Sequence, residues 1–142
     1  MTYFNILFKY GVGRFAEHMQ KAGLRGSIVP DLPPEEAGEY LDAMGEKHLA
    51  PIFIYSPTTP TDRLNTIAGV ADGFVYCVAR KGVTGDQTDF SRQLDEYLSR
   101  CRTSTTLPLA LGFGVKDRAD IQFLEGKAYV AVIGTQALRL VV

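Results

Sequence analysis

Residues 109–114, LALGFG, and residues 130–135, VAVIGT, each join an apolar run to a glycine turn. Glycine lets backbone N–H groups approach an anion closely, and the turns after the last two strands of a βα barrel commonly hold a phosphate. A helix that begins after the second turn would add further unpaired N–H groups. The two turns therefore predict a binding site for a small phosphorylated metabolite.

Apolar, strand-like runs recur upstream of these turns. A polar or amphipathic stretch follows each of five runs, which begin near Ser27, Ala50, Gly73, Leu107 and Ala128. The run Phe74–Val78 is continuously apolar, as expected of a parallel strand that is covered on both faces. Between the third and fourth runs, an apolar stripe at helical spacing contains Leu94, Leu98 and Cys101. This alternation predicts an α/β fold built from βα units.

An opening strand over Tyr3–Ile6 would bring the total to about six parallel strands in a single domain of residues 1–142. Six such strands fit either an open, doubly wound sheet or six consecutive strands of an eight-stranded barrel. An open nucleotide-binding sheet places its glycine fingerprint after the first strand, and the chain has no G-x-G-x-x-G motif. The late glycine turns therefore favour an incomplete (βα)8 TIM barrel, although a closed barrel needs roughly 200 residues or more.

The composition of the chain indicates which partners, cellular locations and ligands to expect. Fifteen Lys plus Arg against 16 Asp plus Glu give a net charge of −1, which argues against nucleic acid as a partner. No apolar run approaches the roughly 18 residues of a membrane span and no secretory leader is evident, so we expect a cytoplasmic protein.

Cys77 and Cys101 have no C-x-x-C spacing and are expected to be reduced core residues. His18 and His48 have no partners at metal-ligand spacing, so no metal is predicted.

Three segments carry candidate chemistry. The string Arg80–Gly85 follows the run at Phe74–Val78 and is interpreted as an active-site loop in which Thr84 forms a hydrogen bond, or as an ordinary surface loop. Asp31 ends another run, where its carboxylate either orients a substrate or bonds to its own loop. Tyr3 and Tyr76 either line a pocket or belong to the core.

Taken in order, several segments resemble the tryptophan synthase alpha subunit from end to end of the chain. The resemblance is carried by Met1–Asn5, Ile28–Glu36, Pro57–Pro60, Gly73–Tyr76, Arg80–Gly85, Gly112–Gly114 and Gly134–Thr135. It implies a (βα)8 barrel of tryptophan biosynthesis, a lyase that cleaves indole-3-glycerol phosphate to indole and glyceraldehyde 3-phosphate. It also implies an alpha2beta2 heterotetramer with a beta subunit that holds pyridoxal phosphate, and no cofactor in this chain.

The same resemblance assigns site residues. The indole pocket would be lined by Tyr3, Ile28, Ile54, Tyr76 and Phe113. The phosphate would be held by Gly85, Gly114, Gly134 and Thr135. Thr84 would belong to the loop that closes over the substrate, and Asp31 would support the acidic centre.

The chain departs from the family pattern in ways that bear on activity. The family's catalytic glutamate and aspartate lie upstream of the region that begins at Met1, and Ile6 stands where the family usually has proline. Met1 is therefore either a true start or an internal residue of a longer chain, and we expect little or no turnover from these 142 residues. Two alternatives are a non-catalytic module that binds phosphate or docks a partner through residues 31–34, and a barrel with another phosphosugar reaction. The unpaired strand edges of an incomplete barrel predict self-association, partial disorder or a longer parent chain.

Overall fold

The computed structural model describes residues 1–78, 87–112, 118–134 and 137–139, with the backbone alone for residues 87–91. All strand pairs in this part of the chain are parallel. The strands are β1 (Gly26–Ile28), β2 (Ala50–Ile52), β3 (Ile54–Tyr55), β4 (Val75–Val78), β5 (Leu109–Gly112) and β6 (Val130–Val132). Each of the five apolar runs predicted from the sequence contains a strand.

Strands β2 and β3 form one pass of the chain that changes partner at Phe53. β2 pairs with β1, and β3 pairs with β4 in a sheet of order β3-β4-β5-β6. The Phe53 carbonyl still accepts a hydrogen bond from Tyr76 N–H at 2.9 Å. Neighbours in space are thus neighbours in sequence, without the reversal of strand order that marks a doubly wound sheet. The prediction of a partial TIM barrel is confirmed.

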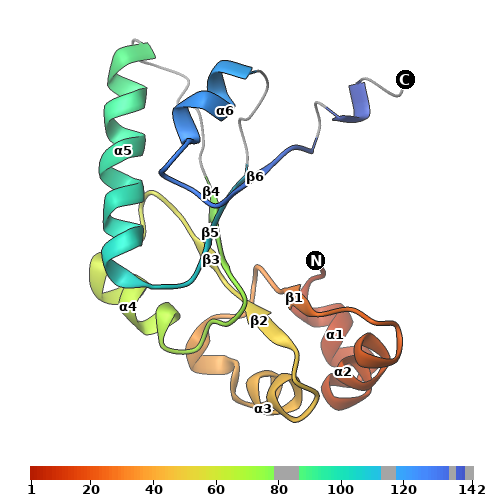
Figure 1. The fold of residues 1–142 in the computed structure, drawn as a ribbon. Coiled ribbons are helices and arrows are strands. Elements are labelled where there is room, and N and C mark those ends of the chain that lie inside the picture. Colours follow the sequence, from red (N-terminus) through yellow and green to blue (C-terminus); the bar gives the residue numbers. More distant parts are fainter. Residues whose placement is uncertain (79–86, 113–117, 135–136, 140–142) are drawn as a thin grey trace.

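The helices cover the outer side of this curved sheet. They are α1 (Phe4–Tyr10), α2 (Val12–Lys21), the 3-10 turn η1 (Pro34–Glu36), α3 (Gly38–Glu46), α4 (Thr61–Ala68), α5 (Gln87–Ser104) and α6 (Arg118–Leu124). Helices α4 and α5 lie beside β3, β4 and β5, whereas α1, α2 and α3 gather around β1 and β2 (Figure 1). The helices separate the strands along the chain, as the alternating sequence pattern predicts.

The main core lies between the strands and these helices. In β1, β2 and β3 the buried residues alternate with half-buried ones, so only one face of these strands is fully covered. Buried tyrosines fasten helices to strands: Tyr40 of α3 donates to the Ser27 carbonyl at 3.1 Å, and Tyr55 of β3 donates to the Leu64 carbonyl of α4 at 2.8 Å. The opposite face of the strands is the interior of the incomplete barrel.

The opening segment is a helix, so the prediction of a strand over Tyr3–Ile6 is wrong. Tyr3 has extended backbone angles, but α1 begins at Phe4 and buries Leu7. The Phe4 N–H donates to Oδ1 of Asp31 at 2.8 Å, which satisfies one of the free donors at the helix start. A cap that lies 27 residues away in sequence therefore outweighs the β-propensity of tyrosine, phenylalanine and isoleucine.

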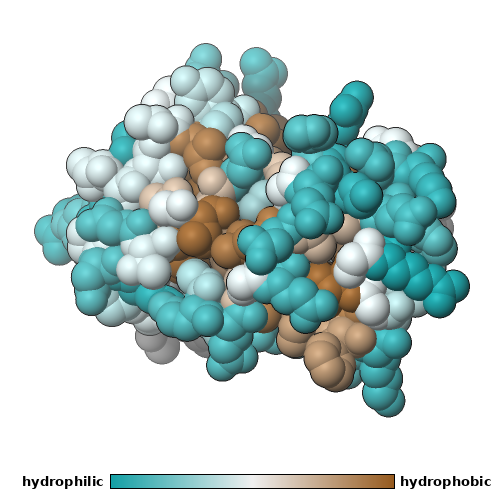
Figure 2. All heavy atoms as spheres, turned by 90° about the horizontal axis from the view of Figure 1, so that it is seen from below, coloured by the Kyte–Doolittle hydropathy of each residue, from teal (hydrophilic) through white to brown (hydrophobic). Residues whose placement is uncertain are grey.

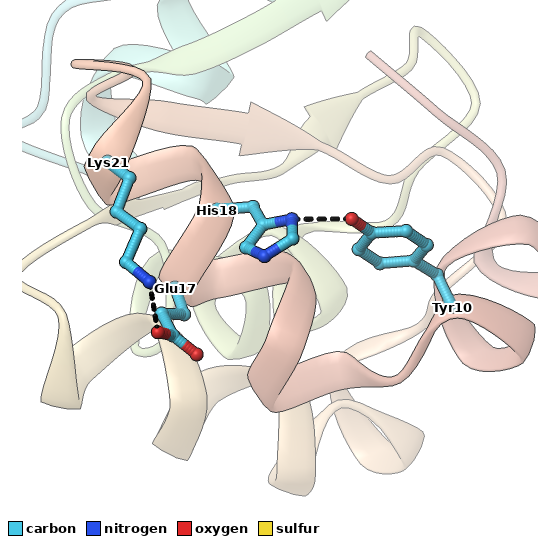
Figure 3. Close-up of polar contacts among 4 residues, drawn as sticks. All are labelled: Tyr10, Glu17, His18 and Lys21. Atoms are coloured by element: carbon cyan, nitrogen blue, oxygen red, sulfur yellow. Dashed lines mark hydrogen bonds and ion pairs between the residues drawn. The ribbon is translucent and has the colours of Figure 1, made fainter.

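Both histidines are exposed, as expected from their lack of ligand partners. Figure 3 shows His18 of α2 facing Tyr10 at the end of α1, with the tyrosine oxygen 2.5 Å from Nδ1. Arg14 lies 4.9 Å from the centre of the Tyr10 ring, and Lys21 pairs with Glu17 on the same helix. The contacts of Tyr10 with His18 and Arg14 hold α1 against α2 at the surface, whereas the Lys21–Glu17 pair lies within α2.

Cys77 and Cys101 are free and buried, which confirms their assignment to the core. Cys77 lies on β4 and Cys101 on α5, so the pair lies where this helix packs on the sheet. The hydrogen bond to Cys101, together with burial, raises the pKa of the Cys77 thiol. A fully buried thiol held in its protonated form has a packing role.

The buried Tyr55 hydroxyl makes the free energy of unfolding depend on pH in the alkaline range. Burial raises the pKa of Tyr55 to about 12, above its ordinary value of 10.0. Because the folded state holds this proton more tightly than the unfolded state, the stabilisation is complete below pH 10 and is lost as pH rises toward 12. We expect the free energy of unfolding to fall by about 2 kcal/mol across this interval through Tyr55 alone.

Urea denaturation at several pH values measures this dependence. Tyr55→Phe should flatten the fall between pH 10 and 12, and Tyr129→Phe, which alters an exposed ring, should leave it unchanged. An equal slope in Tyr55→Phe and the native chain would contradict the assignment.

Candidate substrate-binding face

The carboxyl ends of three neighbouring strands lie at one edge of the sheet. Val78 of β4 is in register with Gly112 of β5, which is in register with Val132 of β6. The chain therefore enters the segments after β4, β5 and β6 from one side of the molecule. The candidate residues Thr84, Gly85, Phe113, Gly114 and Thr135 lie in those segments and fall outside the described residues.

Gly134 is the one proposed phosphate-binding residue within the described part of the chain. It is exposed, and its carbonyl accepts a hydrogen bond from Ala137 N–H at 2.9 Å. A helical turn over residues 137–139 follows. Nothing lies within 4 Å of the position that a Cβ on Gly134 would take. The turn is thus exposed and sterically open, and the phosphate role of Gly134 stays a prediction.

The interior face of the sheet brings together three of the predicted indole-pocket residues. Ile54 is in register with Tyr76, and Ile28 is in register with Ile52, two residues before Ile54 on the same pass. Alternate residues of a strand share a face, so these side chains form a continuous apolar strip. Ile28 and Ile54 are half-buried, and Tyr76 is 8% exposed. An apolar strip that contains an aromatic side chain can lie against an aromatic ring.

Tyr76 depends on a glycine in the next strand. A Cβ built on Gly112 would lie 1.8 Å from the Tyr76 hydroxyl oxygen and 2.3 Å from the ring carbon that carries it. The tyrosine ring therefore lies directly on the Gly112 backbone, and burial raises the pKa of Tyr76. Sequence reasoning assigned Gly112 only to a turn and missed this packing role. The available signal was an aromatic residue in one interior strand and a glycine at the end of the next.

The start of the chain, which carries Tyr3, lies against the end of β1 and the loop that holds Asp31. The Thr2 N–H donates to the Ile28 carbonyl at 3.1 Å, and Oδ1 of Asp31 accepts from Phe4 N–H. Tyr3, between these two contacts, is 62% exposed. The structure thus places Tyr3 next to the strand that carries Ile28, and it gives Asp31 a capping contact.

The cap makes α1 sensitive to substitution of Asp31. Asp31→Ala removes the acceptor for Phe4 N–H, and we expect a loss of about 1 kcal/mol in the free energy of unfolding. Asp31→Asn keeps an acceptor oxygen and is the matched control, with an expected loss of less than half as much. Urea denaturation measures both, and equal losses would contradict the capping role.

A cavity of about 240 Å³ lies between the loop after β1 and α4, with Ile54 of the interior strip in its wall. Its wall consists of the loop after β1 with Phe53, Ile54, Arg63 and Ile67. Arg63 forms an ion pair with Glu35 of η1. Because Ile54 belongs to both the strip and the cavity wall, the loop over residues 29–34 lies beside the candidate pocket.

Arg100 holds the loop that follows β3. Its guanidinium donates to the Pro57 carbonyl at 2.8 Å and to the Thr59 carbonyl at 3.2 Å. Within the loop, Ser56 Oγ lies 2.9 Å from Thr59 Oγ1. Sequence reasoning missed Arg100, because an arginine near the end of a helix gives no sign that it reaches a loop 41 residues earlier.

The described residues contain no group of three or more His, Cys, Asp or Glu side chains that can hold a metal ion. In the same part of the chain, no helix combines the length and apolar character needed to cross a bilayer.

Comparison with protein families gives one match along the whole chain. The model described as "Tryptophan synthase alpha chain" matches residues 1–142. A tryptophan synthase alpha chain of Syntrophotalea carbinolica is 65% identical over 140 residues, which are 99% of this chain and 55% of that protein. One from Desulforapulum autotrophicum is 58% identical over 141 residues and is covered to 56%. The chain spans about half the length of the curated relatives it matches.

Solved structures give the same partial match. The tryptophan synthase a2b2 complex of Pyrococcus furiosus contains a chain that is 30% identical, with a TM-score of 0.88 over 99% of this chain and 57% of that one. Tryptophan synthase subunit alpha of Campylobacter jejuni is 30% identical, with a TM-score of 0.86 over 94% of this chain and 54% of that one.

Proposed function

The chain belongs to the tryptophan synthase alpha chain family, and we propose that it provides the indole- and phosphate-binding part of an indole-3-glycerol-phosphate lyase. The completed enzyme would cleave indole-3-glycerol phosphate to indole and glyceraldehyde 3-phosphate. The observation that carries this proposal is the family match over residues 1–142. The apolar strip on the interior face supports it, because an indole ring needs a flat apolar wall.

The roles of the residues follow from this proposal. Ile28, Ile54 and Tyr76 would contact the indole ring, with Tyr3 and Phe113 at its margins. The phosphate would be bound by backbone N–H groups at Gly85, Gly114, Gly134 and Thr135, where glycine permits close approach. Register at the ends of β4, β5 and β6 supports this assignment, because the segments that hold these residues begin at the same edge.

Two further residues would act near the reacting atoms. Asp31 would support the acidic centre from the end of β1, where its contact with Phe4 N–H fixes one carboxylate oxygen. Thr84 would belong to the segment that closes over the substrate. Proton delivery to the indole ring and proton removal from the glycerol side would fall to two carboxylates outside this chain.

The partner and location follow from the family as well. Tryptophan synthase alpha chains need no cofactor, and pyridoxal phosphate belongs to the beta subunit. The Pyrococcus furiosus relative was solved as an a2b2 complex. We propose a beta-subunit partner in an alpha2beta2 assembly, a cytoplasmic location, and one domain over residues 1–142 that unfolds in a single transition.

A graft tests the proposed function. Residues 1–142 replace the matched 140 residues of the Syntrophotalea carbinolica alpha chain, and indole release from indole-3-glycerol phosphate is measured. We expect activity within about tenfold of the relative, since a chain 65% identical keeps the same pocket. Loss of activity in a graft that folds, as judged by circular dichroism, would overturn the proposal.

A second candidate function is a non-catalytic module that docks a partner through residues 31–34. The cavity of about 240 Å³ beside Arg63 and the proline-rich loop favours it. Indole release by the graft separates the two, because a docking module would give none.

A further inference from the structure

The strand that carries Ile54 is short and is paired on one side. β3 consists of Ile54 and Tyr55, and among the described strands it pairs with β4 alone. On its other side β1 ends at Ile28, in register with Ile52, and Ile54 lines the cavity of about 240 Å³. Ladder hydrogen bonds therefore hold Ile54 from one side, and its position depends on how the chain after β3 is anchored.

The residues that follow β3 form a closed turn over residues 56–59. Thr59 N–H donates to the Ser56 carbonyl at 3.0 Å, and Ser56 N–H donates to Thr59 Oγ1 at 3.2 Å. Ser56 Oγ also lies 3.0 Å from Thr58 Oγ1. Because these bonds make the turn a compact unit, a displacement of its outer carbonyls also moves Ser56, which is close in sequence to Ile54.

Arg100 of α5 holds the outer carbonyls of this turn. Its guanidinium donates to the Pro57 carbonyl at 2.8 Å and to the Thr59 carbonyl at 3.2 Å. Charged side chains of the described residues are not buried, and hydrophilic residues surround an apolar middle on the surface seen from below (Figure 2). Arg100 is half-buried, and none of the ion pairs in the described part of the chain includes it. Its planar fork of donors therefore fixes the direction of the turn as well as its distance from α5.

The other anchor of β3 lies on α4. Tyr55 is fully buried, and its hydroxyl donates to the Leu64 carbonyl at 2.8 Å. Successive side chains of a strand point to opposite faces, so Ile54 faces the interior while Tyr55 faces the helices. The tyrosine thus holds the outward face of β3, and the turn bound by Arg100 holds the end of the strand.

We propose that Arg100 is a positioning residue for the candidate indole pocket: it holds the turn over residues 56–59 and thereby keeps Ile54 in place on the interior strip. Arg100 reaches the turn from the outer side of the sheet and acts on the pocket through Ile54. This inference rests on the proposed function, because it assigns the interior strip to an indole ring. Without Arg100, the wall of the pocket would shift and bind the ring more weakly.

The test uses the graft described above with substitutions on α5. Arg100→Met removes the donors and keeps an unbranched side chain, whereas Arg100→Lys keeps the charge and loses the planar fork. Arg92→Met is the matched control, because Arg92 lies on the same helix and its side chain is 76% exposed. KM and kcat for indole release are measured for each protein and compared with those of the unsubstituted graft.

We expect Arg100→Met to raise KM about fivefold and to leave kcat within about twofold, because a pocket wall binds the ring equally in the ground state and the transition state. Arg100→Lys should raise KM about twofold, since it can keep one of the two bonds. Arg92→Met should change neither constant. A merely structural role of Arg100 would instead lower the folded fraction, and with it the apparent kcat, at unchanged KM.

An unchanged KM in Arg100→Met, or an equal rise in Arg92→Met, overturns the proposal. If Arg100→Met does not fold, as judged by circular dichroism, the KM of Arg100→Lys decides. These outcomes apply to a graft that releases indole.

If the unsubstituted graft releases no indole, the proposed function fails, and binding of indole alone decides the role of Arg100. Indole is titrated into the 142-residue chain while the methyl resonances of Ile54 are followed by NMR. A Kd that rises about fivefold in Arg100→Met would support the positioning role in the absence of lyase activity. Equal Kd values in the two chains, or no binding of indole, would overturn the positioning role as well.

Discussion

The 142-residue chain alone is expected to release indole from indole-3-glycerol phosphate at least about 10⁴-fold more slowly than a full-length relative. Cleavage needs one proton delivered to the indole ring and another removed from the glycerol side. Each positioned general acid or base typically contributes 10²–10⁴-fold to a rate. We propose that these groups are two carboxylates outside residues 1–142, as the family resemblance implies, because Asp31 is held as a helix cap.

The comparison uses purified Syntrophotalea carbinolica alpha chain at equal concentration. Asp31→Asn in the graft is the matched control, because it preserves an acceptor for Phe4 N–H and removes the charge. If Asp31 only supports the acidic centre, Asp31→Asn should lower the rate of indole release by the graft only in part. The isolated 142-residue chain, which lacks both principal acids, should lose more activity relative to the full-length relative. Turnover by the isolated chain within tenfold of the relative would mean that residues within 1–142 perform the proton transfers.

Much of the fold was accessible from sequence because the central strands β4 and β5 are continuously apolar. The runs at β4 and β5 are buried on both faces, and such runs predict parallel strands without knowledge of their partners. The opening helix was not accessible, since its cap comes from Asp31 on another element. Intrinsic β-propensity describes only the isolated segment. In the folded chain, the tertiary contact with Asp31 favours a helix over the strand that the propensity predicts.

For the candidate site as well, residues within sequence motifs could be predicted, whereas contacts between residues far apart in the sequence could not. Ile28, Ile54 and Tyr76 were named through the family resemblance, and the register of β1 to β4 explains why they share one face. The contacts that hold the site were missed. Arg100 reaches the loop after β3 across 41 residues, and Gly112 leaves room for a ring that belongs to another strand. Neither role has a signature in the adjoining sequence.

Gly112→Ala is expected to lower the free energy of unfolding by about 3 kcal/mol, the upper part of the range for overpacking a buried site. The new Cβ would lie 1.8 Å from the Tyr76 oxygen, so the buried ring must leave its position or the backbone of β5 must move. Either response also disturbs the interior strip. Gly45→Ala is the matched control, because a Cβ there meets nothing within 4 Å and alanine favours a helix.

A double-mutant cycle tests whether Tyr76 is the cause. Tyr76→Ala alone removes a buried aromatic side chain and should itself cost about 3–5 kcal/mol. In that background the added cost of Gly112→Ala should fall below about 0.5 kcal/mol, because the atoms that the Cβ meets are gone. Urea denaturation of the four proteins gives the coupling. If Gly112→Ala costs the same with and without the tyrosine ring, strain in β5 itself is responsible and the packing of Tyr76 on Gly112 does not set the glycine requirement.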